Sequence, residues 1–383
     1  LNWQQSVDTS LYQATLTSAN SVNALIKDAE SVTFDSLSNY TINNVSAQET
    51  NESVGPVNAM SEGTIISPNN ITNTSVTKIV DVSQNSDDSI GLYVGSSKDY
   101  YILSSKEIVA PASLAGLFSG CGDLDSITFT NFNTSNVTNM SAMFSGCASL
   151  TTLNLNTIST SNVTNMSAMF NGCANLTTLN ISGADTSSVT NMEGMFYGCT
   201  LLESIVFGSN FTTNSVTTMR NMFKNCASLD NLDLSGFNSG AVTNMEGMFY
   251  GCANLTELDL SNFTNSNVTD LTNMFYGCDS LVTLDVSNFS NARLTSLEGL
   301  FSNLTSLETL TLTNFRLTTV TNISNLFSGC TSLQNILVGA GWSTSSITSS
   351  SNMFYNCTNL PNFDADYVDA TFAFAGGYLT LNN

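Results

Sequence analysis

The stretch Thr190-Asn191-Met192-Glu193-Gly194-Met195-Phe196-Tyr197-Gly198-Cys199 recurs along the chain and sets the spacing of everything between its copies. The phenylalanine of each copy stands at positions 118, 144, 170, 196, 223, 249, 275, 301, 327 and 354, so successive copies are 26 or 27 residues apart. Ten units at a fixed period predict a solenoid, in which each unit contacts only its neighbours. We therefore expect one elongated body, although 383 residues would by length alone suggest two or three globular domains.

One run in each unit has the pattern of a β-strand. It has the form Leu150-x-x-Leu153-x-Leu155, and its last two apolar residues are separated by one polar residue. This alternation is typical of a strand with one buried face. One strand per unit, stacked in parallel, predicts a continuous sheet along one side of the solenoid.

The segment from threonine to cysteine predicts a short helix in each unit. Threonine is a favourable N-cap, and the Met-x-x-Met-Phe spacing after it places three apolar side chains on one helical face. Glu193, Glu246 and Glu298 stand where a capping box needs them. The residue before cysteine is glycine in seven units and asparagine in three, and both tolerate the left-handed conformation that ends a helix. The residues expected in these capping and helix-ending roles include Thr138, Thr164, Thr190, Gly146, Gly172 and Gly198.

The cysteines form one column of the repeat. Nine units carry cysteine three residues after the marker phenylalanine, for example Cys147, Cys173 and Cys199, and one unit carries Leu304 instead. A position that accepts leucine favours a small buried apolar group, so we expect reduced, structural thiols. Stacked units are close enough for disulfides, which keeps pairing between some neighbours as an alternative. The chain has no histidine and no Cys-x-x-Cys, which argues against zinc.

The remaining sequence divides the chain into five parts. Apolar residues from Val7 to Ala29 recur at helical steps and predict an N-terminal helix within residues 1–30. Residues 31–89 are polar and predict irregular β structure or a linker, and residues 90–117 predict a hairpin that caps the first unit. The solenoid follows over residues 118–360, and a C-terminal cap over 361–383. The predicted fold class is therefore α/β, with a parallel sheet on one side, short helices on the other, and an N-terminal helix and irregular β region before them.

The charge balance excludes several classes of function. Eight Lys and Arg against thirty Asp and Glu give a net charge of −22, which repels nucleic acid and anionic membrane surfaces. No run reaches the ~18 apolar residues of a membrane span, so we expect no direct membrane insertion. The chain starts at Leu1 without an initiator methionine, as expected of a processed form or of a fragment. An enzyme would need a nucleophile with its base, a metal cluster or a poised acid pair, and none stands out.

The repeat resembles a known family. Thr134-Ser135-Asn136-Val137-Thr138-Asn139-Met140-Ser141-x-Met143-Phe144-x-Gly146-Cys147, followed by the leucine run, closely resembles the repeat of the BspA-like leucine-rich-repeat surface proteins. The resemblance covers about residues 90 to 365. It implies a leucine-rich-repeat solenoid displayed outside the cell or on its surface, in proteins associated with adhesion. It supplies no catalytic residues.

The candidate functional residues lie on the outward strand positions. Asp233, Asp259 and Asp285 follow one another in successive units, and we hypothesise either a weak Ca²⁺ patch or a solvated acidic stripe there. No other cofactor is expected. The same face presents hydroxyl, amide and acidic groups suited to a protein or carbohydrate ligand, at Asn154, Asn180, Asn231, Glu257 and Thr283.

Two functions compete at this point. The first is a non-enzymatic extracellular binding surface for adhesion, and the second is a structural filament or coat subunit that self-associates through its N-terminal segment and solenoid ends. Asn-x-Ser/Thr sequons such as those at Asn162, Asn210 and Asn254 also predict a glycoprotein if the chain passes through a secretory pathway.

Overall fold

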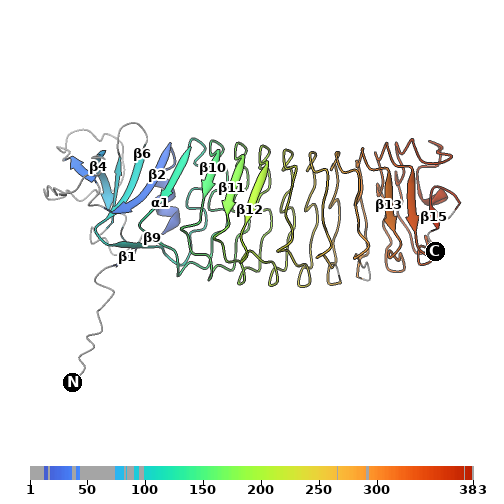
Figure 1. The fold of residues 1–383 in the computed structure, drawn as a ribbon, viewed down its shortest axis with the longest axis horizontal. Coiled ribbons are helices and arrows are strands. Elements are labelled where there is room, and N and C mark those ends of the chain that lie inside the picture. The colour runs from blue at the N-terminus through green and yellow to red at the C-terminus, as the bar shows by residue number, and fades with distance from the viewer. Residues whose placement is uncertain are drawn as a thin grey trace, which may run out of the picture.

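The computed structural model of the protein describes residues 13–15, 18–36, 40–43, 74–81, 83, 90–94, 99–264, 266–289, 293–374 and 376–381. The repeats stack into one elongated solenoid, with the N-terminal strands at one end and the C-terminal segment at the other (Figure 1). We number its coils one to ten by their marker phenylalanines, from Phe118 to Phe354. A single apolar core runs along the whole length of the stack.

The predicted parallel sheet forms on one side of the solenoid. Strands β10 (Thr152–Asn154), β11 (Thr178–Ile181) and β12 (Ser204–Phe207) pair in parallel, with equivalent repeat positions opposite each other. Strands β13 (Thr309–Leu312) and β14 (Asn335–Val338) do the same nearer the C-terminus. The three coils between these two groups follow the same path, as Figure 1 shows, without a regular strand in their described residues.

The predicted helices on the other side are wrong, because this segment is a series of β-turns. The amide of Cys147 donates to the carbonyl of Phe144 in the same coil (3.1 Å), as in a turn. The amide of Phe144 instead donates to the carbonyl of Met169 in the next coil (2.8 Å). Because amides alternate between these two kinds of partner, half of the turn segment's hydrogen bonds connect neighbouring coils. A helix would place all of them within one coil.

Two residues per coil, four positions apart, hold the turns in shape. In coil two they are Ala142, with φ of 52°, and Gly146, with φ of 76°. A right-handed helix needs φ near −63°, so these positions break it twice within one turn segment. The glycine and asparagine column before cysteine therefore has the left-handed conformation expected from the sequence, but it belongs to a turn rather than to a helix end.

The threonine column joins coils and caps nothing. The backbone amide and the hydroxyl of Thr164 both donate to the carbonyl of Thr138 in the preceding coil, at 2.8 and 3.1 Å. The residue after threonine has the local role: the side-chain oxygen of Asn139 accepts the amide of Ser141 (2.9 Å). The predicted N-caps at Thr138, Thr164 and Thr190 are therefore wrong. The predicted capping boxes fail with them, since Glu193 and Glu246 bind an arginine instead.

The core consists of stacked columns of identical side chains. The ten marker phenylalanines are buried, and successive rings stack with centroids 5.2 to 6.0 Å apart. All nine cysteines are free and buried. Eight of the thiols donate to a backbone carbonyl of the coil before their own, as Cys173 does to Phe144 (3.1 Å), and Cys121 in the first coil donates to the carbonyl of Ile26. Burial raises the pKa of Cys173 to about 12, so its thiol stays protonated.

The N-terminal segment covers the first coil, but not as one long helix. Strand β1 (Gln13–Thr15) pairs with β7 (Glu107–Val109), which continues in register to β9 (Phe132–Asn133). The helix α1 (Ala19–Leu25) is seven residues long, and its Asn23 amide donates to the carbonyls of Leu117 and Ser119 at 3.1 Å each. Val7 and Leu11 of the predicted helix lie outside the described residues. Residues 13–15 are extended because β7 offers them a parallel strand edge.

A six-stranded sheet follows in the order β3-β4-β5-β6-β2-β8. Its strands are β3 (Tyr40–Asn43), β4 (Thr74–Asp81), β5 (Gly91–Val94), β6 (Asp99–Ser104), β2 (Ser31–Ser36) and β8 (Ser126–Phe129). β5 and β6 form an antiparallel hairpin. The strand that pairs with the first solenoid strand is nevertheless β2, which buries Phe34 against the core. A segment expected to be irregular thus supplies the cap.

The C-terminal segment closes the other end. Strand β15 (Thr380–Leu381) pairs in parallel with β14, and the short 3-10 helix η3 (Ala370–Phe372) precedes it. Tyr378 is buried, and its ring meets the ring of Phe354 edge-on at 5.0 Å. Both ends of the solenoid therefore finish in non-repeat segments.

Candidate functional site

The residues of the predicted binding face lie in two adjacent columns of the sheet side. Asn154 and Asn180 lie directly opposite each other on β10 and β11. Asn231, Glu257 and Thr283 are exposed in the neighbouring column, which also contains Thr152 and Thr178. The side-chain oxygens of Asn154 and Asn180 each accept a backbone amide two residues further on, at 3.0 Å. The side-chain oxygens of Asn154 and Asn180 therefore already have a hydrogen-bond partner within their own coils.

The three aspartates of the acidic stripe also turn toward their own backbone. Asp233, Asp259 and Asp285 accept the amides of the serines two residues further on, at 2.9, 2.9 and 2.8 Å. Hydrogen bonds from that serine lower the pKa of Asp233 and of Asp259. Within the described parts of the chain, no three acidic or thiol side chains converge as a metal site requires. The Ca²⁺ hypothesis stays a prediction, with no coordinating cluster to support it.

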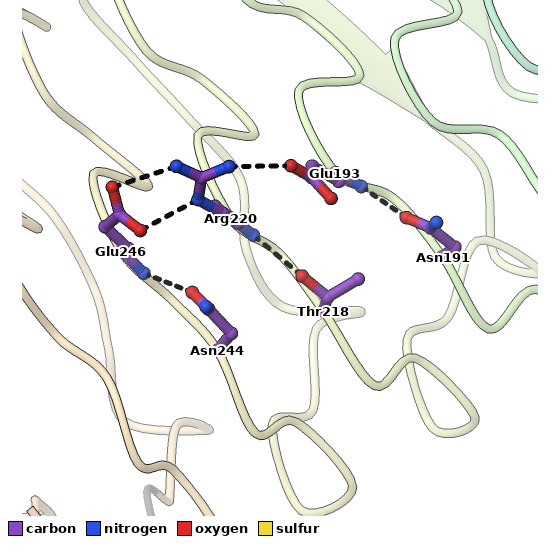
Figure 2. A network of polar contacts seen from close by, with 6 residues as sticks. All are labelled: Asn191, Glu193, Thr218, Arg220, Asn244 and Glu246. Atoms are coloured by element: carbon purple, nitrogen blue, oxygen red, sulfur yellow. Dashed lines mark hydrogen bonds and ion pairs between the residues drawn. The ribbon is translucent and has the colours of Figure 1, made fainter.

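The opposite, turn side of coils four to six carries an ion-pair network that sequence reasoning missed. Figure 2 shows Arg220 between two glutamates of the neighbouring coils. Its guanidinium donates to both carboxylate oxygens of Glu246, at 2.8 and 3.2 Å, and to Glu193 at 3.1 Å. Asn191 and Asn244 accept the amides of the two glutamates at 2.9 and 2.8 Å, so the turns aim both carboxylates at the arginine (Figure 2).

This network positions charges and adds little stability. The side chains of Arg220 and Glu193 are 41% and 42% exposed, and an exposed ion pair is worth about 0–1 kcal/mol. Hydrogen bonding from Arg220 lowers the pKa of Glu246, and the same bonds raise the pKa of Arg220. Arg220 and Glu246 are therefore charged at neutral pH, and Glu193 lies on the other side of the guanidinium. Their geometry makes a fixed row of alternating charges across three coils.

An aromatic row lies in a neighbouring column of the same turn segments. Tyr250 and Tyr276 stack with ring centroids 4.5 Å apart. The ammonium of Lys224 lies 4.4 Å from the ring centroid of Tyr250 and 5.9 Å from that of Tyr197, within cation–π range. Two of the eight basic residues of the chain are therefore gathered on this side. We call this group the turn-face cluster; it consists of Glu193, Tyr197, Arg220, Lys224, Glu246, Tyr250 and Tyr276.

A signal for the cluster was present in the sequence. Tyr197, Lys224, Tyr250 and Tyr276 follow one another at repeat spacing, in the column directly after the marker phenylalanine. A helix in each unit would account for the apolar columns and would leave this outer column without a role. In a stack of turns, the same positions are brought side by side. Rings and charges that are 26 or 27 residues apart then touch.

The stacked coils, the parallel sheet and the leucine-rich columns define a solenoid of the leucine-rich-repeat type. The chain belongs to the family described as "Mycoplasma protein of unknown function, DUF285", which matches residues 112–206, 174–283, 203–308 and 280–370. This membership confirms the predicted resemblance to BspA-like repeat proteins.

Among solved structures, the chain is similar to a leucine-rich cell surface protein from Faecalibacterium prausnitzii A2-165. The two share 18% sequence identity with a TM-score of 0.33, over 70% of this chain and 84% of that one. No curated protein matches the chain. In the residues that the structure describes, no helix has both the length and the apolar character to cross a membrane.

Proposed function

We propose that the protein is a non-enzymatic surface or extracellular repeat protein that adheres to a protein partner through the turn-face cluster. The observation that carries the proposal is the concentration of partly exposed tyrosine, arginine and glutamate side chains on four successive coils. Only 10% of the chain is charged, so such a concentration differs from the serine, threonine and asparagine around it. Tyrosine and arginine are enriched at protein interfaces and at their energetic centres.

The scaffold suits this role because it holds the cluster rigidly. Backbone hydrogen bonds link every coil to the next through the turn segment, and the stacked phenylalanines lie directly beneath it. Arg220 is already ordered between Glu193 and Glu246, so a partner would not have to immobilise it. The resemblance to BspA-like repeats supports display outside the cell. The buried thiols, with raised pKa values, suit an oxidising environment without pairing.

The self-assembling filament is the alternative, and the structure offers less for it. Stacking solenoids end to end needs an open coil, whereas β2 and α1 cover the first coil and β15 pairs with the last solenoid strand. The strand-face residues remain a second proposed contact surface, for a protein or a carbohydrate.

The test compares two variants that each neutralise one charge. Beads coated with the wild-type protein, with Arg220→Gln or with Glu257→Gln are scored for adhesion to an immobilised basement-membrane protein mixture. We expect the wild-type protein to adhere and Arg220→Gln to adhere at least about fivefold more weakly, a loss of roughly 1 kcal/mol or more. Glu257→Gln should adhere as the wild type does.

Loss confined to Glu257→Gln would move the proposed contact to the strand face. Equal adhesion of all three proteins would overturn the role of the cluster. Electron microscopy and size-exclusion chromatography of the same samples, showing fibres or large oligomers, would favour the filament.

A further inference from the structure

The tyrosine column is interrupted next to the turn-face cluster. After Tyr276 in coil seven, coils eight and nine carry Ser302 and Ser328 in the same column, and coil ten carries Tyr355. Two small residues between two rings leave a pocket of about 420 Å³, lined by both tyrosines and both serines. This volume lies within the ~300–1,000 Å³ typical of small-molecule sites. We call it the serine slot.

The coil spacing sets the length of the serine slot. The marker phenylalanine rings of coils seven to ten are 6.0, 6.0 and 5.6 Å apart in succession, so the two tyrosines stand three coil steps from each other. One face of Tyr276 is covered by Tyr250, with which it stacks along the axis of the solenoid. Its other face therefore points along the axis toward the slot. Tyr355 at the far end is 59% exposed, and its ring is free to meet a ligand.

The lining between the two rings is polar and uncharged. Asn303 and Asn325 line it together with the two serines, and apart from the two tyrosines every other lining residue is asparagine or glycine. Asn303 and Asn325 have φ of 57° and 58°, the left-handed turn conformation of their columns. Ser302 is buried, and its hydroxyl donates to the carbonyl of Ser328 (2.9 Å), so the Ser328 hydroxyl and the asparagine amides are the groups left for a ligand. Amide and hydroxyl groups supply both donors and acceptors at short spacing.

The chemistry of this lining eliminates most classes of ligand. A cation would find no carboxylate in the lining, and an anion such as phosphate would find no lysine or arginine. A wholly apolar ligand would cover the Ser328 hydroxyl and the asparagine amides and leave them without hydrogen bonds, which opposes its binding. What fits is a neutral ligand with many hydroxyl groups and a face of C–H groups.

We propose that the serine slot binds a neutral saccharide. A pyranose ring would lie with its C–H face against Tyr276 or Tyr355, because an aromatic face carries negative potential and attracts positively polarised C–H groups. The ring hydroxyls would bond to Ser328, Asn303 and Asn325. This site goes beyond the proposed adhesion to a protein, since it lies over coils seven to ten and shares only Tyr276 with the turn-face cluster.

A tyrosine in place of Ser328 would fill the slot, and other coils already carry tyrosine at this position of the repeat. In Ser328→Tyr a third tyrosine enters the gap, as Tyr250 and Tyr276 already stack in coils six and seven. The matched control is Ser145→Tyr, the same substitution in the same column of coil two, outside the slot. Tyr355→Ala removes one wall, at an exposed site where folding is little affected.

The experiment is saturation-transfer NMR and calorimetric titration of the whole chain with cellotriose, mannotriose, chitotriose and, as the anionic comparison, sialyllactose. We expect binding of at least one neutral trisaccharide, weakened about tenfold or more in Ser328→Tyr and in Tyr355→Ala and unchanged in Ser145→Tyr.

No binding of any neutral probe at millimolar concentration would overturn the proposal, as would equal binding by Ser328→Tyr. Stronger binding of sialyllactose than of the neutral probes would overturn the assignment of a neutral ligand. Arg220→Gln is expected to bind saccharide normally, which separates this site from the adhesion test.

Discussion

Replacing Ala142 and Ala168 by glycine tests the turn architecture directly, because the sign of the effect depends on it. Both alanines have positive φ, 52° and 53°, in the column where other coils have glycine or asparagine. In the helix predicted from the sequence, alanine is the most favourable residue and glycine costs about 1 kcal/mol per site. In the observed turn, alanine is the strained residue.

The expected magnitude follows from two opposing terms. An alanine in the left-handed region costs about 1–2 kcal/mol, which glycine relieves. Glycine also makes the unfolded chain more flexible, which opposes folding by about 0.4–1 kcal/mol per site. Both methyl groups are only half-buried, so little apolar contact is lost. We expect Ala142→Gly together with Ala168→Gly to stabilise the protein by about 1 kcal/mol, whereas a helix would lose about 2 kcal/mol.

The measurement is urea unfolding followed by circular dichroism, with the slopes compared to confirm that the unfolding transition itself is unchanged. Ala148→Gly is the control, because Ala148 is exposed and has ordinary negative φ. There we expect a loss of about 0.4–1 kcal/mol. A loss in the double variant equal to or greater than twice that of the control would refute the turn assignment.

Three further outcomes follow from the core and the ion pairs. Phe223→Ala should cost about 3–5 kcal/mol in urea unfolding, because its ring is fully buried between the stacked rings of two neighbouring coils; a loss below about 1 kcal/mol would contradict the stacked core. Arg220 lowers the pKa of Glu246 in the folded state, so the contribution of this pair to stability is present above the unfolded pKa and is lost as pH falls through the folded pKa. The difference in Tm between wild type and Arg220→Gln should therefore shrink on acidification in calorimetry, and a pH-independent difference would speak against the pairing. Because burial raises the pKa of Cys173 to about 12 and all nine thiols are buried, a thiol reagent at mildly alkaline pH should label the folded protein negligibly and all nine cysteines in urea; rapid labelling of the folded protein would show that the thiol column is open.

The N-terminal region of the chain shows the limits of local sequence pattern. Ala14 fits the helical pattern of residues 1–30, yet it lies in β1, because β7 offers a strand edge that local sequence does not reveal. Likewise β2 comes from a polar region with few apolar residues, but Val32 and Phe34 are fully buried because β6 and β8 flank them. Both elements owe their conformation to partners about 70 to 95 residues away in the chain.

For the candidate site, too, the sequence could place some residues together, whereas other contacts required the structure. Strand-face positions such as Asn154 and Asn180 could be placed together in advance, since parallel stacking in register aligns equivalent repeat positions. The sequence could not place Lys224 against Tyr197 and Tyr250 in advance, nor could it locate the serine slot beyond Tyr276. They depend on how far the turn segment brings successive side chains together, which periodicity alone does not specify.

By itself, the sequence determined the number of coils, the parallel sheet and the buried columns, because ten copies of one pattern show which positions tolerate only apolar or small residues; the structure then showed that all nine thiols are free. Only the tertiary structure decided that the segment around Thr190 and Cys199 is a ribbon of turns. The physical reason is that Met-x-x-Met-Phe spacing suits a helix and a turn series equally well, and the choice depends on where the backbone amides find acceptors. Here every second amide finds one in the next coil, and that partner exists only once the coils are stacked.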